Sequence, residues 1–277
     1  MLPRLPRLMG IVNVTPDSFS DGGRWADPEA AIEHGRRLLA DGADILDIGG
    51  ESTRPGATRP LVEEELGRVV PVISALAATG AAVSVDTMRA EVAQAAIDAG
   101  ASIVNDVSGG LADPAMLPVV AASEATYVAM HWRAHSDRMQ DFASYDGPGG
   151  VLAAVREELS ERVGAMLDAG IERPRIVLDP GLGFAKQGEH NWELLRGLDG
   201  LAELGFPILV GASRKRFLGA LLAAPDGTPR GVDEREYAGA ALTLLLAQRG
   251  VWGLRVHDVR ASRDTLRVLA RMTGCHE

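Results

Sequence analysis

Cysteine, positive charge and long apolar runs are scarce in this sequence, and each scarcity excludes a class of protein. The one cysteine, Cys275, excludes an internal disulfide and a cysteine-ligated metal site, which favours a reducing compartment. The formal net charge of −10 argues against general binding to nucleic acid or to a membrane surface, which requires a basic face. The N-terminal stretch has neither a long apolar segment nor a cleavage-like site. We therefore expect no targeting peptide, no transmembrane helix and a cytoplasmic location.

A repeated pattern is present instead: a short apolar run, a polar residue at its end, and then a longer helical stretch. The expected strands cover residues 8–12, 43–48, 82–85, 102–104, 126–130, 175–178, 207–210 and 252–256. The expected helices cover residues 28–40, 62–78, 89–99, 113–122, 150–169 and 191–198, segments on either side of 225–231, and 260–272. Several of these helices end at a glycine, which is the usual C-terminal cap.

The alternation of strands and helices predicts the fold. The expected strands are continuously apolar and rich in β-branched residues, as in parallel strands that are buried on both faces. Strict alternation predicts an α/β fold with a parallel sheet. Eight units without a linker predict that residues 1–277 form one catalytic domain, a single (β/α)8 TIM barrel with its active site at the C-terminal ends of the strands. An open doubly wound sheet is the alternative.

Polar residues lie at or just after the end of every expected strand, and in a barrel they would all lie at the same end. They are Asn13, Asp47, Asp86, Asn105, His131, Asp179, Ser213 with Lys215, and Arg255 with His257. A single polar residue after a strand is often only a helix cap or a turn former. The whole set is better explained by an active site at the barrel mouth.

The residue types at these strand ends suit a flat heterocycle and an anion. The carboxylates of Asp86 and Asp179, with the carboxamide of Asn105, match the paired N–H donors of an aminopyrimidinone. Lys215 offers a donor to a ring carbonyl or ring nitrogen. The residues suited to an anion are Arg54, the cluster 213–216, Arg255 and His257.

Asn13 is the candidate metal ligand. The sequence has no HExxH or CxxC cluster, so a protein-caged metal is not expected. An amide oxygen suits a Mg²⁺ ion that is shared with a phosphate, although taken alone Asn13 is better explained as a turn residue.

Seven segments at these positions carry a family resemblance. Residues 10–23 read GIVNVTPDSFSDGG and residues 42–55 read GADILDIGGESTRP. The other five are SVDT at 84–87, NDVSG at 105–109, LDPGLGFAK at 178–186, GASRK at 211–215 and RVHDV at 255–259. Together they run from the first expected strand to the last, and they resemble the dihydropteroate synthase family of pterin-binding barrels. The SRK and RVHDV segments separate the synthases from their relatives.

The resemblance implies an alkyl-transferring enzyme of folate biosynthesis. Its substrates would be (7,8-dihydropterin-6-yl)methyl diphosphate and 4-aminobenzoate, and its products 7,8-dihydropteroate and diphosphate. The resemblance also implies Mg²⁺ as cofactor, a cytoplasmic homodimer formed through the last three units, and sulfonamides as inhibitors.

The resemblance further implies roles for particular residues. Asn13 is expected to bind Mg²⁺. The expected substrate-binding residues are Thr53, Arg54, Pro55, Asp86, Asn105, Asp179, Phe184, Ser213, Lys215, Arg255, Val256 and His257. The expected catalytic residues are Asp21, Lys215, Arg255 and His257. Within these sets, the pterin is assigned to Asp86, Asn105, Asp179 and Lys215; the diphosphate to Thr53, Arg54, Arg255 and His257; and the aminobenzoate to Thr53, Pro55, Phe184, Lys215 and the turn 213–216.

These roles lead to an expected mechanism. A dihydropterin supports a methylene cation and an aromatic amine needs positioning more than a base, so we expect an SN1-like displacement. Asp21 would stabilise the cation, and loops 14–25 and 51–61 would close over the site and exclude water. Two positions depart from the family pattern: Arg216, where a serine is common, and Trp132, to which no role is assigned.

Two other functions stay open. A folate-dependent corrinoid methyltransferase would share the pterin site, but it would not need Lys215, Arg255 and His257 because it holds no diphosphate. An inactive pterin-binding paralogue would be expected to have lost the first two loops, and both segments are intact in this sequence.

Overall fold

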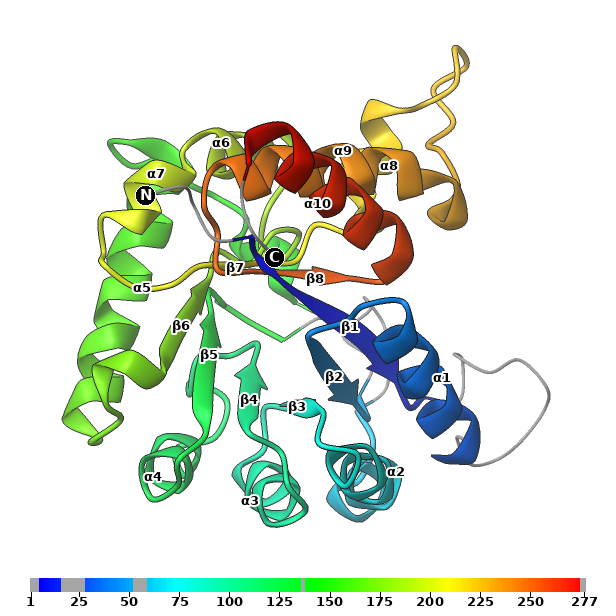
Figure 1. Cartoon of the computed structure of the whole chain (residues 1–277). Helices are drawn as coiled ribbons and strands as arrows, with labels where there is room; N and C mark the ends of the chain where they lie inside the picture. Colours follow the sequence, from blue (N-terminus) through cyan, green and yellow to red (C-terminus); the bar gives the residue numbers. More distant parts are fainter. Residues whose placement is uncertain (1–4, 16–27, 52–58, 136–137, 275–277) are drawn as a thin grey trace.

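The computed structural model describes residues 5–15, 28–51, 59–135 and 138–274, and it contains eight parallel strands arranged as a ring (Figure 1). The strands are β1 (Arg7–Asn13), β2 (Ile45–Gly49), β3 (Ala82–Asp86), β4 (Ile103–Asp106), β5 (Thr126–Met130), β6 (Ile176–Asp179), β7 (Leu209–Val210) and β8 (Gly253–Val256). Their order is β6-β5-β4-β3-β2-β1-β8-β7. An isolated bridge between Leu178 and Ile208 joins the two ends, with Leu178 N 2.9 Å from Pro207 O. The ring is therefore a nearly closed barrel.

Helices follow the strands and cover the outside of the ring (Figure 1). They are α1 (Pro28–Ala40), α2 (Val62–Ala77), α3 (Ala90–Asp98), α4 (Met116–Ala121), α5 (Gly150–Asp168), α6 (Gly188–Arg196), α7 (Leu198–Ala202), α8 (Arg216–Leu221), α9 (Glu236–Gln248) and α10 (Val259–Thr273). Short 3-10 turns lie at Met139–Phe142, Arg173–Arg175 and Val232–Arg235. The predicted (β/α)8 fold is confirmed, and the open sheet is excluded by the bridge between β6 and β7.

Strand alternation divides the core into two parts. One cluster of buried side chains comes only from strands: Met9, Ile45, Ile103, Val128, Val177 and Leu209. The larger cluster contains the alternate strand residues together with the helices, so it lies between the ring and its cover. Successive strand side chains point to opposite faces, and residues two further along a strand point to the same face. Moving two residues from Ile45, Ile103 and Val177 gives Asp47, Asn105 and Asp179. These polar side chains therefore lie inside the ring, one layer nearer its C-terminal mouth.

The strand ends differ slightly from the predicted boundaries. Asn13, Asp86 and Asp179 were expected to follow their strands, but they are the last residues of β1, β3 and β6. Each still takes part in the parallel ladder, for example Gly49 with Asp86 and Met130 with Asp179. Pairing to a neighbouring strand fixes the backbone of these side chains more firmly than a loop would.

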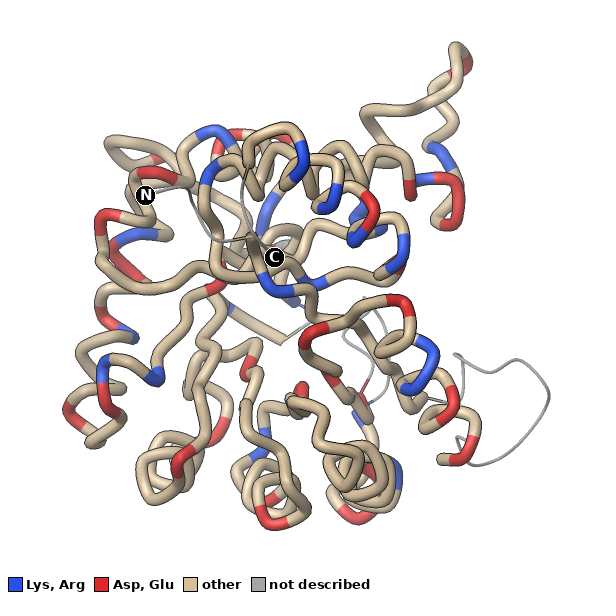
Figure 2. Tube along the Cα trace, in the orientation of Figure 1, with Lys and Arg blue, Asp and Glu red and all other residues tan. Residues whose placement is uncertain are grey.

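The outer surface carries both signs of charge. Acidic and basic residues are interspersed over the outer helices of the described chain (Figure 2). None of the described helices combines the length and the apolar character that crossing a membrane requires.

Candidate active site at the barrel mouth

Four side chains from four strands meet inside the mouth. The fully buried Asp47 on β2 accepts hydrogen bonds at Oδ2 from Arg255 Nε, at 2.6 Å, and from Asn105 Nδ2, at 3.0 Å. Arg255 on β8 also donates from Nη2 to Asp86 Oδ2, at 2.7 Å. Arg255 was expected among the residues suited to an anion, and the structure places its guanidinium between two carboxylates. It thus ties β2, β3 and β8 together under the site.

Burial changes the proton affinity of the carboxylates at the mouth. Burial raises the pKa of Asp86 to about 7, and nearby Asp47 adds to the rise while Arg255 opposes it. Burial also raises the pKa of Asp179, although Gly181 N–H donates to its Oδ1 at 2.7 Å. Burial alone would lower the pKa of Arg255, but Asp47 and Asp86 raise it above its ordinary value. The mouth therefore holds a permanent cation beside an acid that titrates near neutrality.

Lys215 and Phe184 form another part of the mouth. Lys215 immediately precedes α8, and its Nζ lies 4.5 Å from the centre of the Phe184 ring. The same Nζ donates to Leu182 O. Burial lowers the pKa of Lys215 to about 8, against the opposing effect of Asp179. Phe184 and Trp132 pack on a small apolar cluster of Met88, Val107 and Met130. A cation, an aromatic face and an apolar wall thus lie next to the carboxylates.

Ser213 and His257 are held together by two contacts. The backbone N–H of His257 donates to Ser213 Oγ at 3.2 Å, and Ser213 Oγ lies 3.0 Å from His257 Nδ1. When the hydroxyl donates to Nδ1, the ring proton lies on Nε2, so the imidazole presents a donor at its other nitrogen. Such a donor suits an anionic ligand.

Asn13 is close to Asp86 across Gly49. A Cβ atom added to Gly49 would lie 3.7 Å from Asp86 Oδ2 and 3.8 Å from Asn13 Oδ1. The described residues include no group of three or more His, Cys, Asp or Glu side chains that could hold a metal. A Mg²⁺ ion takes few protein ligands when phosphate oxygens and water supply the rest. One amide oxygen beside a carboxylate, at a glycine that adds no side chain, fits that arrangement.

The chain was compared with known proteins. A family model described as "Pterin binding enzyme" matches residues 9–257. A dihydropteroate synthase of Mycobacterium leprae is 54% identical over 264 residues, which cover 95% of this chain and 92% of that relative. This chain belongs to the dihydropteroate synthase family of pterin-binding enzymes.

Solved structures of the dihydropteroate synthase family have the same fold. The Xanthomonas albilineans enzyme with 4-aminobenzoic acid is 48% identical, with a TM-score of 0.88 over 97% of this chain and 93% of that chain. The same enzyme in complex with 7,8-dihydropteroate aligns at 44% identity, with a TM-score of 0.84 over 99% and 95% of the two chains. The resemblance, the barrel fold and the transferase class predicted from the sequence are confirmed.

The structure brings most of the predicted site residues together, with exceptions. Asp21, Thr53, Arg54 and Pro55 lie outside the described residues. The side chain of Val256 packs in the core between the ring and the helices, so only its backbone faces the mouth.

Two contributions were missed by the sequence analysis. Asp47 was noted as a strand-end residue of the dihydropteroate synthase pattern, but its bonds to Arg255 and Asn105 were not foreseen. Lys186 received no role, although it ends the LDPGLGFAK segment and its side chain is only 4% exposed. A lysine within an apolar, glycine-rich segment was the available signal, because lysine is rarely buried without partners.

Proposed function

We propose that this chain joins (7,8-dihydropterin-6-yl)methyl diphosphate to 4-aminobenzoate, with release of diphosphate, in folate biosynthesis. One observation carries the proposal: Asp86, Asn105 and Asp179 face one mouth beside Lys215, in a chain of the dihydropteroate synthase family. The Xanthomonas albilineans relative has been solved with 4-aminobenzoic acid and with 7,8-dihydropteroate, which supports the two substrate classes.

The pterin would bind among the buried polar groups of the mouth. Ionised Asp86 and Asp179 accept N–H donors of the aminopyrimidinone, Asn105 pairs with its edge, and Lys215 donates to the ring carbonyl or a ring nitrogen. The apolar wall of Met88, Val107 and Met130 would cover the ring. Hydrogen bonds in this low-dielectric interior discriminate strongly against heterocycles that lack the matching donors.

The diphosphate would lie at the Asn13 and His257 side of the mouth. Asn13 would hold Mg²⁺, whose chemistry when bound is to neutralise charge that develops on the leaving group. Ser213 orients His257 so that Nε2–H can donate to a phosphate oxygen. Arg255 adds positive charge that stays constant with pH, and Asp47 holds it in place. We include Arg54 and Thr53 among the residues that would bind the diphosphate.

The reaction would be an SN1-like displacement. The C–O bond breaks with its electron pair moving to diphosphate, and the methylene carbon is left as a cation conjugated with the dihydropterin. The amine lone pair then forms the C–N bond, and the amine proton leaves to solvent. Phe184 and Lys215, with Thr53, Pro55 and the turn 213–216, would position the aminobenzoate. Asp21 would stabilise the cation.

The decisive assay is release of diphosphate that depends on 4-aminobenzoate. Purified protein with both substrates and Mg²⁺ should release diphosphate and form dihydropteroate in equal amounts. Absence of release would contradict the proposal and would favour an inactive paralogue. Methyl transfer from methyltetrahydrofolate to a corrinoid in the parallel assay would favour the methyltransferase instead.

A homodimer through the helices of the last three units is part of the proposal, which we narrow to α8, α9 and α10. These helices lie together on one side of the barrel (Figure 1), and they expose Tyr237 at 90%, Met272 at 80% and Val268 at 63%. Exposed large apolar side chains on neighbouring helices suit an interface with a second copy of the chain. Tyr237→Glu should convert the dimer to a monomer in light scattering, and an unchanged mass would count against this surface. The cytoplasmic location and the sensitivity to sulfonamides stay predictions.

A further inference from the structure

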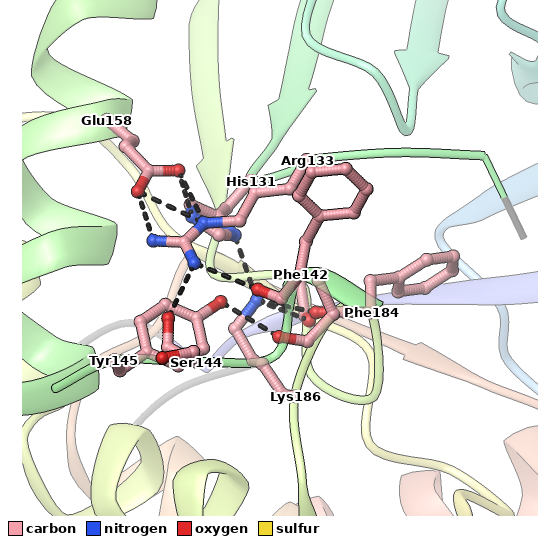
Figure 3. Close-up of polar contacts among 10 residues, drawn as sticks. His131, Arg133, Phe142, Ser144, Tyr145, Glu158, Phe184 and Lys186 are labelled. Atoms are coloured by element: carbon pink, nitrogen blue, oxygen red, sulfur yellow. Dashed lines mark hydrogen bonds and ion pairs between the residues drawn. The ribbon is translucent and has the colours of Figure 1, made fainter. Parts of the chain in front are cut away.

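A largely buried polar cluster contacts the segment that carries Phe184, and the function proposed above does not use it. We call it the brace; it consists of His131, Arg133, Tyr145, Glu158 and Lys186 (Figure 3). Its side chains come from the end of β5, the segment that follows β5, helix α5 and the segment between β6 and α6. His131 and Lys186 are 2% and 4% exposed, so neither can contact a substrate directly.

Lys186 is the centre of the brace. Its Nζ lies 2.9 Å from His131 Nδ1, 3.0 Å from Gly181 O and 3.0 Å from Phe184 O. An ammonium group has three donors, and these three acceptors match them one for one. Burial lowers the pKa of Lys186 well below its ordinary value, with Asp179 opposing the change. The three acceptors are therefore what makes a buried lysine tolerable here.

The other side chains of the brace connect Lys186 to a second point on the segment 181–186. Because His131 Nδ1 accepts from Lys186, its proton lies on Nε2, which donates to Glu158 Oε2 at 2.9 Å. Arg133 Nε also donates to Glu158, and the Arg133 guanidinium lies 4.1 Å from the centre of the Tyr145 ring. Tyr145 OH donates to Ala185 O at 2.9 Å. The brace thus begins and ends on the segment 181–186.

The charges within the brace are consistent with this arrangement. Burial and the neighbouring Lys186 lower the pKa of His131 to about 4, so the imidazole is neutral at neutral pH. Burial alone would raise the pKa of Glu158, but hydrogen bonds from His131 and Arg133 lower it to about 2. Glu158 is therefore an anion between the neutral imidazole of His131 and the cationic guanidinium of Arg133.

The segment 181–186 depends on hydrogen bonds from side chains for its shape. Gly181, Gly183 and Ala185 have positive φ angles of 66°, 80° and 46°. Backbone of this kind forms neither a helix nor a strand, so it lacks the regular hydrogen bonds of those elements. Its carbonyl groups accept from side chains instead: Gly181 and Phe184 from Lys186, Leu182 from Lys215, and Ala185 from Tyr145. Loss of these donors would let the segment move, and Phe184 would move with it.

We propose that Lys186 is a positioning residue for the aminobenzoate side of the site, because it holds the segment 181–186 so that Phe184 faces Lys215. The inference rests on the proposed function, and it assigns to the brace control over one substrate but not the other. The pterin contacts at Asp86 and Asn105 come from β3 and β4, whereas the brace comes from α5 and from the segments that follow β5 and β6. Asp179, on β6, is the pterin residue whose charge acts on Lys186.

The test compares Lys186→Met with Arg175→Met. Lys186→Met removes three donors and keeps an unbranched side chain. The KM for 4-aminobenzoate should rise about tenfold, the equivalent of losing about 1.4 kcal/mol. The Kd of the pterin diphosphate should stay within about twofold. Arg175 is the matched control, because its Nη1 binds three carbonyl groups, of Val120, Ser123 and Ala125, before β6 at the other end of the barrel. Arg175→Met should lower Tm without changing the ratio of the two substrate constants.

A double-mutant cycle shows whether Lys186 acts through Phe184. Phe184→Ala should raise the KM for 4-aminobenzoate, and adding Lys186→Met to it should raise that KM by less than about twofold more. Independent, multiplied effects would overturn the proposal.

Tyr145→Phe keeps the ring and removes only the hydrogen bond to Ala185 O. We expect a smaller rise in the KM for 4-aminobenzoate, and this variant gives a second test if Lys186→Met does not fold. A wild-type protein that makes no dihydropteroate would overturn the function and this inference together. An active wild type with unchanged constants in Lys186→Met and Tyr145→Phe would overturn the inference alone.

Discussion

The barrel mouth and the brace are both made of buried charged side chains, yet they differ in how far their polar atoms are satisfied. At the mouth, Asp47 Oδ1 and Ser84 Oγ are buried without a hydrogen-bond partner among the described residues. In the brace, Lys186 uses its three donors and Glu158 accepts from two neighbours. Buried polar groups normally have hydrogen-bond partners. A buried group without a partner in the protein can bind a ligand or an ordered water, whereas a fully hydrogen-bonded cluster stabilises the structure.

The two regions also differ in their proton affinities. Burial raises the pKa of Asp86 to about 7, so the mouth can exchange protons near neutral pH. In the brace, the pKa of Glu158 is about 2 and that of His131 is about 4, so these groups keep one charge state across the same range. A pKa that is shifted toward neutral pH is typical of functional sites, whereas a pKa that is shifted away from neutral pH is typical of structural ion pairs. We expect the mouth to respond to pH, and His131 and Glu158 of the brace to keep their charge states.

The largest expected effect comes from Lys215, which lies at the mouth and contacts the segment that the brace holds. It donates to Leu182 O of the braced segment, and its charge lies near Asp179 and Asp86. Lys215→Ala should lower kcat/KM by about 10³-fold, since it removes a preorganised cation from the site. Steady-state assays of diphosphate release would measure this, and Lys215→Arg should restore part of the loss. Full activity in Lys215→Ala would remove this residue from the site.

Sequence reasoning found the mouth residues because they recur at one place in each strand–helix unit. Strand alternation and the ends of apolar runs identify Asp86, Asn105 and Asp179 as inward-facing at the mouth. The contact between Asp47 and Arg255 was not predictable in this way, because it joins residues 208 positions apart across the interior of the ring. Which inward-facing side chains meet there depends on the stagger of the closed barrel, which a linear pattern does not contain.

The brace was missed for a different reason. Glu158 lies on α5 next to exposed Glu157, and by pattern alone both are ordinary surface charges of a helix. His131 was noted only as a strand end, and its partner Lys186 is 55 positions later in the chain. The contact between His131 and Lys186 requires the segment 181–186 to bend, with Ala185 at a φ of 46°. Alanine rarely adopts a positive φ, so the sequence does not predict this bend.

The second effect in size tests the role of Asp47 beneath the mouth. Asp47→Asn keeps the shape but removes the anion that holds Arg255, and kcat/KM for the pterin diphosphate should fall about 100-fold. The KM for 4-aminobenzoate should change little, which is the reverse of the result expected for Lys186→Met. Ser84→Ala is the control, because removing a buried hydroxyl without a described partner is close to neutral. Equal losses of kcat/KM in Asp47→Asn and Ser84→Ala would mean that any change beneath the mouth lowers activity, and that the Asp47–Arg255 pair has no special role.

The third prediction uses the different proton affinities of the two regions. With Asp86 at a pKa of about 7 and Lys215 at about 8, kcat/KM should rise as Asp86 ionises and fall as Lys215 loses its proton. The change should be about tenfold for each pH unit on the outer limbs of the profile. Lys215→Arg should move the falling limb to higher pH, because arginine stays protonated. A flat profile between pH 5 and pH 10 would contradict the role of both groups.

The smallest expected effect tests whether the brace is structural. Glu158→Gln keeps the size of the side chain and removes the charge between His131 and Arg133. We expect Tm to fall by a few degrees and the KM for 4-aminobenzoate to rise about threefold, because neutral hydrogen bonds replace charge-assisted ones. Glu157→Gln, one residue earlier and exposed, should change neither quantity. A shift in the pH profile of Glu158→Gln would show that the brace also takes part in protonation at the mouth, and the distinction between the two regions would then be wrong.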